Sequence, residues 1–334
     1  MIRVALLGCG TMGKIHARAY TSIQTATVVA VCDIRKEMAD ALATSLGCEA
    51  CYSFEELRIA FSYDVLDICL PTYLHARYAI HAMKEGKHVF CEKPIALNIE
   101  DAKAMVDTAA SCKVKFSVGQ VLRFFPQYRE AARQMQEGRI GIPRLMRTSR
   151  NQSFPGWSWE NWYHDVEKSG GPEVDLAIHD YDWLIHHLGK VSRIYAKNLG
   201  TEHPGHMHSL AILRFTNGAM AHVEASWAMP QGAEFRTTFE FIGTEGQLCY
   251  DSSKDCPLKV QVGVQEDDCI IYDNPVAETQ NPYRAELVSF FHAILHDRDP
   301  EVTAESALES LRIALAVKES AQSGKAVVIE EIRK

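Results

Sequence analysis

A lysine at the end of a short apolar stretch is the first residue whose position suggests chemistry. In HVFCEKPIAL (88–97), the pattern predicts a buried strand over 88–91, followed directly by Glu92, Lys93 and Pro94. The proline fixes the backbone just behind the ammonium group. Two interpretations stay open: an ordinary turn, or a rigid position from which Lys93 stabilises negative charge that develops on a substrate oxygen.

An aspartate and a histidine four residues apart offer acid–base chemistry. Asp175 and His179 begin the stretch DLAIHDYDWLIHHLG, for which the pattern predicts one helix over 175–189. In a helix this spacing places both side chains on one face. A histidine accepts a proton near neutral pH, and an aspartate beside it orients the ring and stabilises its charged form. The pair is therefore a candidate general base.

The helical pattern alone favours a less specific interpretation of this segment. The polar stripe continues through Asp182 and His186, which is more typical of a solvated face. The glycines at 170–171 favour the catalytic interpretation, because they let a ligand approach the backbone closely. Lys93 would supply a complementary partner. We expect the Asp–His pair to be functional, and Asp182 and His186 to face solvent or an interface.

Three glycines near the N-terminus match the phosphate-binding turn GxGxxG. In LLGCGTMG, Gly8, Gly10 and Gly13 lie between a predicted strand (2–8) and a helix that begins at Thr11. The first glycine permits a tight turn, and the second lets the backbone approach a pyrophosphate at the helix N-terminus. The third lets helix and strand pack closely. The pattern predicts a dinucleotide site.

Asp33, which ends the predicted strand over 27–33, indicates which dinucleotide binds. A carboxylate here can bind the adenosine ribose hydroxyls and would repel the 2′-phosphate of NADP. Arg35 and Lys36 follow closely and could offset that repulsion. The sequence therefore favours NAD and leaves NADP possible.

The elements that would position these residues begin as an alternation of strands and helices. Short apolar runs alternate with helical patterns up to about residue 120, which is the signature of a doubly wound parallel sheet. Ligands of such sheets lie beyond the carboxyl ends of the strands. The residues at those ends are Pro71, Thr72 and His75, then Glu92, Lys93 and Pro94, then Gln120 and Arg123.

The pattern changes in the second part of the chain. From residue 144 the sequence is strand-rich with period-two alternation, which predicts an α+β domain with a large open, mainly antiparallel sheet. We expect an N-terminal Rossmann dinucleotide-binding domain over 1–122 and a substrate-binding and oligomerisation domain over 123–334. Two late helices, near 282–297 and 303–322, are expected to pack back across the sheet or onto the first domain.

The composition excludes several classes of protein. The 334-residue chain is 47% hydrophobic and 23% charged, which argues against disorder, and its net charge of −8 disfavours nucleic-acid binding. No apolar run approaches the roughly 20 residues that span a bilayer, and the N-terminus does not resemble a signal peptide. Ten dispersed cysteines indicate free thiols in a reducing cytosol, and Cys48 and Cys51 alone are weak evidence for a metal. We expect a cytoplasmic protein without metal, nucleic-acid or membrane partners.

The sequence as a whole resembles the glucose–fructose oxidoreductase/inositol dehydrogenase/rhizopine catabolism (Gfo/Idh/MocA) family of NAD(P)-dependent oxidoreductases. The resemblance covers nearly the whole chain and rests on six stretches: GCGTMG, PTYLH, CEKP, SGGPEVDLAIHDYD, PYRAELVSFFHAI and ESLRIALAVKESAQSGKAVVI. It implies that Lys93 lies beside nicotinamide and substrate, and that Asp175 and His179 complete the catalytic set. The glycine turn, the strand ends and the resemblance together give the predicted cofactor-binding residues: Gly8, Gly10, Thr11, Met12, Gly13, Asp33, Arg35, Pro71, Thr72, His75, Glu92, Lys93, Pro94, Gln120, Arg123, Trp162 and Tyr283.

Some of these cofactor-binding residues have ordinary alternatives. Pro71 and Pro94 could be simple turn formers. His75 and Arg123 could be surface groups, and Tyr283 could merely start a helix.

Departures from the family pattern concern the substrate. Tyr163 stands where a basic residue is frequent in some branches, and Pro172 and Glu173 replace the usual small residues after the double glycine. Three tryptophans in PGWSWENWYH (155–164) could pack in the core or form an aromatic rim for a polyol. These residues leave the substrate open.

The resemblance implies oxidation of a secondary hydroxyl of a sugar, inositol or related polyol by hydride transfer to nicotinamide, with His179 as base. One alternative keeps the redox site but cleaves a glycoside through transient oxidation. Another is a dinucleotide-binding sensor without turnover. One face of the open sheet is not expected to be covered by helices of the same chain. We therefore expect this face to be buried against another subunit, in a homodimer or homotetramer formed through the second domain.

Overall fold

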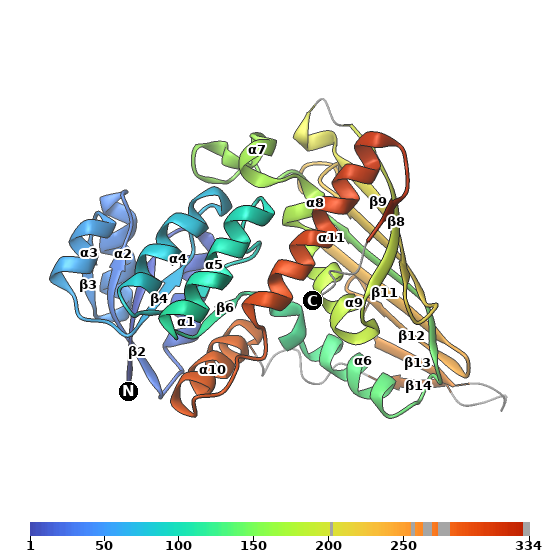
Figure 1. The fold of residues 1–334 in the computed structure, drawn as a ribbon, viewed down its shortest axis with the longest axis horizontal. Coiled ribbons are helices and arrows are strands. Elements are labelled where there is room, and N and C mark those ends of the chain that lie inside the picture. The colour runs from blue at the N-terminus through green and yellow to red at the C-terminus, as the bar shows by residue number, and fades with distance from the viewer. Residues whose placement is uncertain (201–202, 255–257, 263–268, 273–280, 330–334) are drawn as a thin grey trace. The chain divides into compact units, whose positions relative to one another are not determined.

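The computed structural model describes residues 1–200, 203–254, 258–262, 269–272 and 281–329. The chain divides into two compact units, 1–124 with 280–308 and 125–279 with 309–334. Figure 1 shows the elements of both units in chain order. The first of the two late helices belongs to the first unit, and most of the second belongs to the other.

The first unit contains a six-stranded parallel sheet in the order β3-β2-β1-β4-β5-β6. Its strands are β1 (Ile2–Leu7), β2 (Ala26–Cys32), β3 (Glu49–Cys51), β4 (Val65–Ile68), β5 (His88–Cys91) and β6 (Phe116–Val118). The strand order reverses between β1 and β4. In a doubly wound sheet this switch point opens the crevice at the carboxyl ends of the strands.

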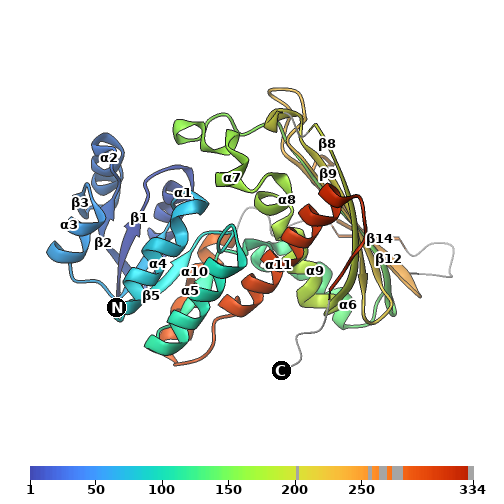
Figure 2. The same cartoon turned by 45° about the horizontal axis from the view of Figure 1, so that its top comes forward.

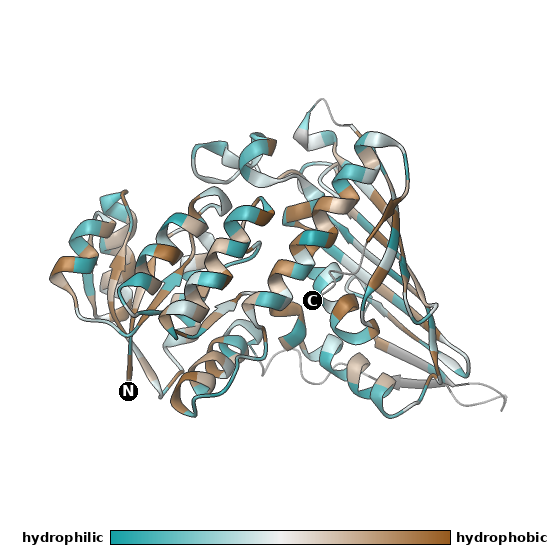
Figure 3. Ribbon diagram, viewed as in Figure 1, coloured by the Kyte–Doolittle hydropathy of each residue, from teal (hydrophilic) through white to brown (hydrophobic). Residues whose placement is uncertain are grey.

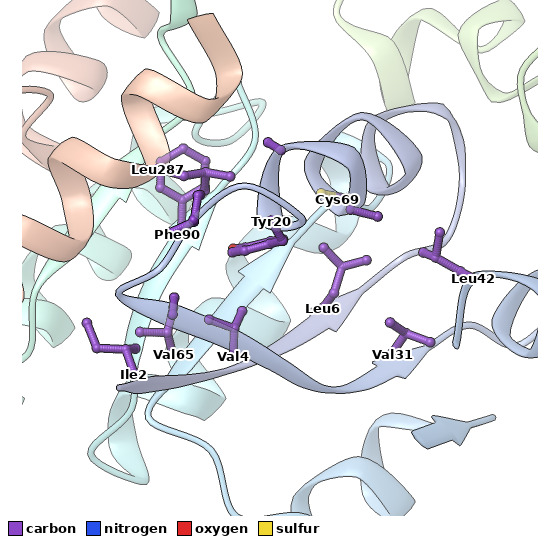
Figure 4. Close-up of a cluster of buried hydrophobic side chains, with 14 of the residues drawn as sticks. Ile2, Val4, Leu6, Tyr20, Val31, Leu42, Val65, Cys69, Phe90 and Leu287 are labelled. Carbon is purple, nitrogen blue, oxygen red and sulfur yellow. The ribbon is translucent and has the colours of Figure 1, made fainter. Parts of the chain in front are cut away.

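Helices cover both faces of this sheet. They are α1 (Thr11–Tyr20), α2 (Lys36–Leu46), α3 (Phe54–Ala60), α4 (His75–Lys84), α5 (Ile99–Cys112) and α10 (Pro282–Leu295). Figures 1 and 2 show α3, α4 and α5 together on one face. Helices α1, α2 and α10 pack on the other, where Leu6, Phe90 and Leu287 belong to one buried core cluster (Figure 4).

Short-range signals set the ends of several helices in this unit. The side chain of Ser53 accepts a hydrogen bond from the Glu56 N–H at 3.1 Å, and that of Asn98 accepts one from the Asp101 N–H at 2.7 Å. Both residues therefore cap their helices. The last strand, β6, begins only at Phe116, because Lys113 still caps α5 in a left-handed conformation with a φ of 55°.

The second unit contains a nine-stranded sheet in the order β14-β13-β12-β11-β7-β10-β9-β8-β15. Its strands are β7 (Pro143–Asn151), β8 (Val191–Leu199), β9 (His208–Phe215), β10 (Met220–Ser226), β11 (Arg236–Gly243), β12 (Gly246–Asp251), β13 (Leu258–Val262), β14 (Cys269–Tyr272) and β15 (Val327–Val328). All neighbours are antiparallel except β7 and β10, which are parallel. This confirms the mainly antiparallel sheet that period-two alternation predicts.

One face of this sheet is covered by helices. In Figures 1 and 2, α6 (Pro126–Gln136), α8 (Pro172–Asp175) and α9 (Ile178–Leu188) lie on the same side of it. Hydrophobic and hydrophilic residues alternate along the strands (Figure 3), and along β9 alternate positions are buried. No helix among the described residues of this unit covers the other face, where Tyr195, Ile212 and Met220 are exposed.

The longest described helix is α11 (Ala304–Ser323), with 20 residues. Near its end, the hydroxyl of Ser320 accepts a hydrogen bond from the Ala196 N–H of β8 at 3.0 Å. None of the described helices is both long enough and apolar enough to cross a membrane.

Candidate active site

The turn between β1 and α1 requires its glycines. Gly8 has a φ of +102°, and a Cβ there would lie 2.5 Å from the carbonyl oxygen of Cys69. A Cβ on Gly13 would lie 1.9 Å from the oxygen of Gly8. Around Gly10, a Cβ would meet only Arg35 among the described residues, at 3.9 Å. No side chain caps α1 at Gly10, which fits a turn that offers its first N–H groups to a pyrophosphate.

The acid at the end of β2 is already hydrogen-bonded. The guanidinium of Arg35 donates to the two oxygens of Asp33 at 3.0 and 2.8 Å, and the Cys9 N–H donates at 2.9 Å. Burial raises the pKa of Asp33, but the hydrogen bonds from Arg35 and Cys9 outweigh it and lower the pKa below its ordinary value. Asp33 is therefore a carboxylate, and ribose hydroxyls would share it with Arg35 or displace Arg35.

Four other residues that were predicted to bind the cofactor lie in two turns. Thr11 and Met12 form the first turn of α1. Pro71 and Thr72 follow β4 and start the short 3₁₀ helix over 72–74, in which Thr72 is buried. Their contact with the cofactor remains a prediction.

Lys93 follows β5 in a turn whose other residues are tightly held. Glu92 is 5% exposed, and its Oε2 accepts a hydrogen bond from the Lys93 N–H at 3.1 Å. The Lys93–Pro94 peptide bond is cis. The ring of His75 lies between two backbone carbonyls, 2.8 Å from the oxygen of Pro94 and 2.9 Å from that of Leu70. The turns after β4 and β5 are therefore linked through one side chain.

His75 is fully buried, and burial lowers its pKa, so the imidazole is neutral. A neutral ring carries one N–H and can donate to only one of the two carbonyls at a time. Both nitrogens nevertheless face backbone oxygen. The predicted contact of His75 with the cofactor stays a prediction, and the contacts that the structure contains support the turn at Pro94.

Gln120, just after β6, is a buried side chain whose surroundings fit a polar ligand. It is 1% exposed, and neither its amide nitrogen nor its oxygen has a hydrogen-bond partner among the described residues. A buried amide without partners is costly, so the site is built for a polar group that is not part of the chain. The orphaned amide after β6 and the glycine turn after β1 lie at the same carboxyl edge of the sheet, and both fit a dinucleotide that extends along this edge.

Arg123 and Tyr283 occupy structural positions within the first unit. The guanidinium of Arg123 donates to the Glu301 carbonyl at 3.1 Å and to the Ser306 hydroxyl at 3.2 Å. Tyr283 starts α10, and its ring centroid lies 6.3 Å from that of His16. Neither placement tests whether these residues contact the cofactor.

A buried network behind Lys93 was missed by the sequence analysis. His16 of α1 lies with its Nδ1 2.9 Å from Asp67 and its Nε2 3.0 Å from Glu92. Possible metal ligands gather here, since His16 lies within 4.8 Å of Asp67 and Cys69 and of Glu92 and Glu286. Both ring nitrogens point at carboxylates, however, so we assign them hydrogen bonds and no metal. The available signal was Asp67, the one charged residue in the apolar run VLDICL.

The second unit supplies the Asp–His pair from a broken helix. The prediction of one helix over 175–189 was wrong: α8 ends at Asp175 and α9 begins at Ile178. The Ala177 N–H bonds the Pro172 carbonyl five residues back at 2.8 Å, which widens the turn between the helices. Asp175 is buried and His179 is half-buried. Their common face, deduced for a continuous helix, remains a prediction.

Aromatic side chains surround the approach to Asp175. The hydroxyl of Tyr163 lies 3.5 Å from its Oδ1. The Tyr163 ring stacks on Trp162 with centroids 4.0 Å apart, and its edge contacts with Trp157 and Trp227 span 6.1 and 5.7 Å. The tryptophan-rich stretch therefore packs around Tyr163. The predicted contact of Trp162 with the cofactor is untested.

Charged residues later in α9 have different surroundings from those expected. Asp182 was expected at solvent or an interface, but it is 1% exposed and accepts a hydrogen bond from the Ser310 hydroxyl at 3.0 Å. That prediction was wrong, because α9 is packed on more than one side. His186 is exposed, as expected. Asp180, which the sequence analysis passed over, is buried and pairs with buried Arg150 of β7 at 2.5 Å.

None of the cysteines whose side chains the structure describes takes part in a disulfide. Cys51 is buried in β3, and Cys48 is half-buried just before that strand. No described group of possible metal ligands includes either residue.

Comparison with known proteins decides the family. A model of the "Oxidoreductase family, NAD-binding Rossmann fold" matches residues 2–120, and one of the "GFO/IDH/MocA C-terminal domain" matches residues 128–249. The NAD(+)-dependent scyllo-inositol 2-dehydrogenase of Bacillus subtilis (strain 168) is 30% identical, over 98% of this chain and 96% of that protein. The chain belongs to the Gfo/Idh/MocA family. It is an NAD-dependent oxidoreductase with an N-terminal NAD-binding Rossmann fold.

The names of other similar proteins describe different reactions at this level of similarity. The 2,7-anhydro-N-acetylneuraminate hydratase of Escherichia coli (strain K12) is 28% identical, over 100% of this chain and 99% of that protein. A structure of levoglucosan dehydrogenase in complex with NADH and levoglucosan has a TM-score of 0.87 and 25% identity, covering 99% of this chain and 100% of that chain. Family membership therefore fixes the cofactor chemistry and leaves the substrate to be inferred.

Proposed function

We infer that this oxidoreductase oxidises a secondary hydroxyl of a sugar, an inositol or a related cyclic polyol. Bound NAD would supply the hydride acceptor. His179 takes the hydroxyl proton as the carbon gives up its hydride, and Asp175 orients and stabilises the imidazolium that forms. The Lys93 ammonium stabilises negative charge on the same oxygen.

The observation that carries this proposal is the support of Lys93. A lysine on a flexible turn could not hold its ammonium group at one position beside a substrate oxygen. A lysine that is merely on the surface would not need a buried carboxylate to fix its backbone. Here the preceding side chain is a buried carboxylate that binds the Lys93 N–H, and His75 binds the carbonyl of the following proline. Such fixed positioning is typical of residues that must stabilise charge in a reaction.

A substrate panel tests the proposed function. The purified chain is assayed with inositol isomers, anhydrosugars, aldoses and sugar acids, using NAD and NADP separately and following nicotinamide absorbance. We expect at least one cyclic polyol or sugar to reduce NAD, and Lys93→Ala to abolish that turnover while NAD still quenches protein fluorescence. Absence of turnover on the whole panel, with normal NAD binding, would contradict the proposal.

A second candidate function keeps the same redox site without net oxidation. The hydratase among the relatives favours it, because its name describes no overall oxidation. In such a reaction a transient ketone would activate a neighbouring bond for elimination or cleavage, and the hydride would return to the product. Co-purified NAD, together with conversion of a glycoside or anhydrosugar without NADH accumulation, would favour this candidate over the first.

We propose that the uncovered face of the nine-stranded sheet forms a homodimer or homotetramer. Tyr195 and Ile212 are paired across β8 and β9, and Met220 lies on the adjacent strand, so three large apolar side chains share one exposed patch. Ile212→Glu should shift the sedimentation coefficient towards the monomer, and an unchanged assembly would contradict the assignment of this face.

A reducing cytoplasm is the compartment that we propose for the chain. No disulfide joins the cysteines whose side chains the structure describes. Free buried thiols are typical of a reducing compartment. Fractionation of the source cells tests this location, and recovery of the protein outside the cytoplasm would contradict it.

A further inference from the structure

The histidine behind the strand-end lysine is held between two carboxylates. His16 is 0% exposed; its Nδ1 lies 3.1 and 2.9 Å from the two oxygens of Asp67, and its Nε2 lies 3.0 Å from Oε1 of Glu92. Carboxylates only accept hydrogen bonds, so an N–H is needed on both ring nitrogens. Only the imidazolium form has both. The geometry therefore indicates a permanently charged histidine.

The groups around His16 support that charge state. Burial lowers the pKa of His16, but Asp67 and Cys69 together outweigh this effect through charge and hydrogen bonding, and the pKa lies well above its ordinary value. Cys69 remains a thiol, since burial raises its pKa, and its sulfur lies 3.4 Å from Nδ1. Burial and the nearby Glu92 raise the pKa of the Glu286 carboxyl in α10 well above its ordinary value, which favours the protonated form.

The core cluster excludes water from this network. Tyr20 donates from its hydroxyl to Asp67 at 2.8 Å, and the Phe90 ring meets the His16 ring edge-on at 5.7 Å. Figure 4 shows Tyr20, Cys69 and Phe90 in the cluster between the sheet and its helices. In such surroundings a charge-assisted hydrogen bond is strong and a missing partner is costly.

The network leads from the glycine turn to the turn that carries Lys93. His16 lies three residues after Gly13 in α1, and it holds one oxygen of Glu92. The other oxygen of Glu92 accepts the Lys93 N–H at 3.1 Å. A Cβ on Gly119 would lie 3.1 Å from Oε1 of Glu92, so the end of β6 also closes on this carboxylate. Glu92 is thus fixed from three sides.

We propose that His16 is a positioning residue for the reaction: its charged ring fixes the Glu92 carboxylate, and Glu92 fixes the backbone from which the Lys93 ammonium projects. The inference rests on the proposed role of Lys93 in turnover. It goes further, because it assigns the rigidity of the lysine turn to a histidine that does not itself touch substrate or cofactor. The same contact connects the helix that follows the phosphate-binding turn with the catalytic turn.

His16→Gln is the first test, with His88→Gln as its matched control. His88 starts the same strand that Glu92 follows, and its Nδ1 accepts a hydrogen bond from the Lys115 N–H at 2.9 Å. We expect kcat to fall by about 10- to 100-fold in His16→Gln, with NAD affinity within about twofold of the parent. His88→Gln should leave both values nearly unchanged. Equal effects of the two substitutions, or an equal loss of kcat and NAD affinity, would overturn the proposal.

Coupling between His16 and Glu92 separates positioning from general destabilisation. If His16 acts through Glu92, then His16→Gln combined with Glu92→Gln should lose no more activity than the more severe single variant. Multiplicative losses would indicate independent structural effects and contradict the proposal. If His16→Gln does not fold, Glu92→Gln replaces it as the test. Removing one counter-charge should lower the pKa of His16, which can be measured in that variant.

Two NMR measurements need no turnover at all. In the full chain with NAD bound, the ring nitrogens of His16, assigned by their loss in the Gln variant, should keep imidazolium shifts up to pH 8. Hydrogen exchange at the Lys93 amide should be at least about tenfold faster in His16→Gln than in His88→Gln, because the Glu92 acceptor is no longer fixed. A neutral His16, or unchanged exchange, would overturn the proposal even if the activity remained unknown. Positive NMR results with an inactive substrate panel would instead count against the proposed function alone.

Discussion

The two candidate catalytic groups are held in different ways. In the first unit, Lys93 follows a strand of a parallel sheet, and buried hydrogen bonds fix its turn on both sides. In the second unit, Asp175 and His179 flank a break between two helices, and Tyr163 reaches Asp175 at 3.5 Å. A strand end supplies a common rigid position, whereas the helix break depends on local loops and aromatic packing. The first region belongs to the NAD-binding Rossmann fold, and we propose that the second region sets the substrate choice.

Loss of the proposed base should give the largest effect. His179→Ala should reduce kcat by about 10²–10⁴-fold, because the alcohol proton then has no positioned acceptor. NAD affinity, measured by fluorescence titration, should remain within about twofold. His186→Ala is the matched control, since His186 is exposed on the same helix. If the His179 variant turned over as fast as the control, His179 would not be the general base.

Breaking the buried ion pair between Arg150 and Asp180 tests how much this pair stabilises the second unit. Arg150→Met leaves buried Asp180 without its cation and should reduce the free energy of unfolding by about 3–5 kcal/mol. Arg147→Met, on the same strand, removes a pair with Glu240 that is partly exposed, and should cost about 0–1 kcal/mol. Denaturant unfolding of the two variants measures the difference. Equal midpoints would show that Arg150 contributes no more than a surface charge.

The raised pKa of Glu286 predicts that the stability of the first unit depends on pH, and the second unit need not show the same dependence. The folded pKa is raised, so the unfolded chain ionises first as pH increases, and stability falls from near pH 4.5 upward. The expected slope is about 1.4 kcal/mol per pH unit until the folded group ionises. Glu286→Gln has no proton to lose, so its stability relative to the parent should rise between pH 5 and pH 7. Parallel stability curves would contradict a neutral Glu286.

Changes at the adenosine end should be smaller and should separate the two charges there. Asp33→Ala should weaken NAD binding by about tenfold and reduce discrimination against NADP, since the ribose acceptor and the repulsive charge are both lost. Arg35→Ala should act in the opposite direction, because it frees Asp33 and removes a cation that a 2′-phosphate could use. Titration with both dinucleotides measures the two effects. If both variants had the same preference for NAD over NADP, Asp33 would not determine which dinucleotide binds.

Local sequence signals predicted the first region well. The steric need for glycine at Gly8 and Gly13 arises within one strand–turn–helix unit, so spacing alone was sufficient. The caps at Ser53 and Asn98 depend on residues three positions away. The mainly antiparallel second sheet followed from alternation along each strand.

Predictions failed where the surroundings of a residue depend on contacts with residues that lie far away in the sequence. Asp182 belongs to a polar stripe in sequence, yet the hydroxyl of Ser310, 128 positions away, binds it in the interior. The prediction of a continuous helix over 175–189 was wrong, because the Ala177 N–H bonds the Pro172 carbonyl five residues back and the helix is interrupted there. Arg150 and Asp180 gave no periodic signal, since their pairing joins a strand to a helix.

The sequence by itself determined the order of strands and helices, the dinucleotide turn and the residue types available for chemistry, because these depend on short-range sterics and periodicity. Only the tertiary structure decided that His16, Asp67 and Glu92 form one buried network behind Lys93. Those residues lie 51 and 76 positions from His16 along the chain. Their attraction becomes strong only after packing has removed water from between them.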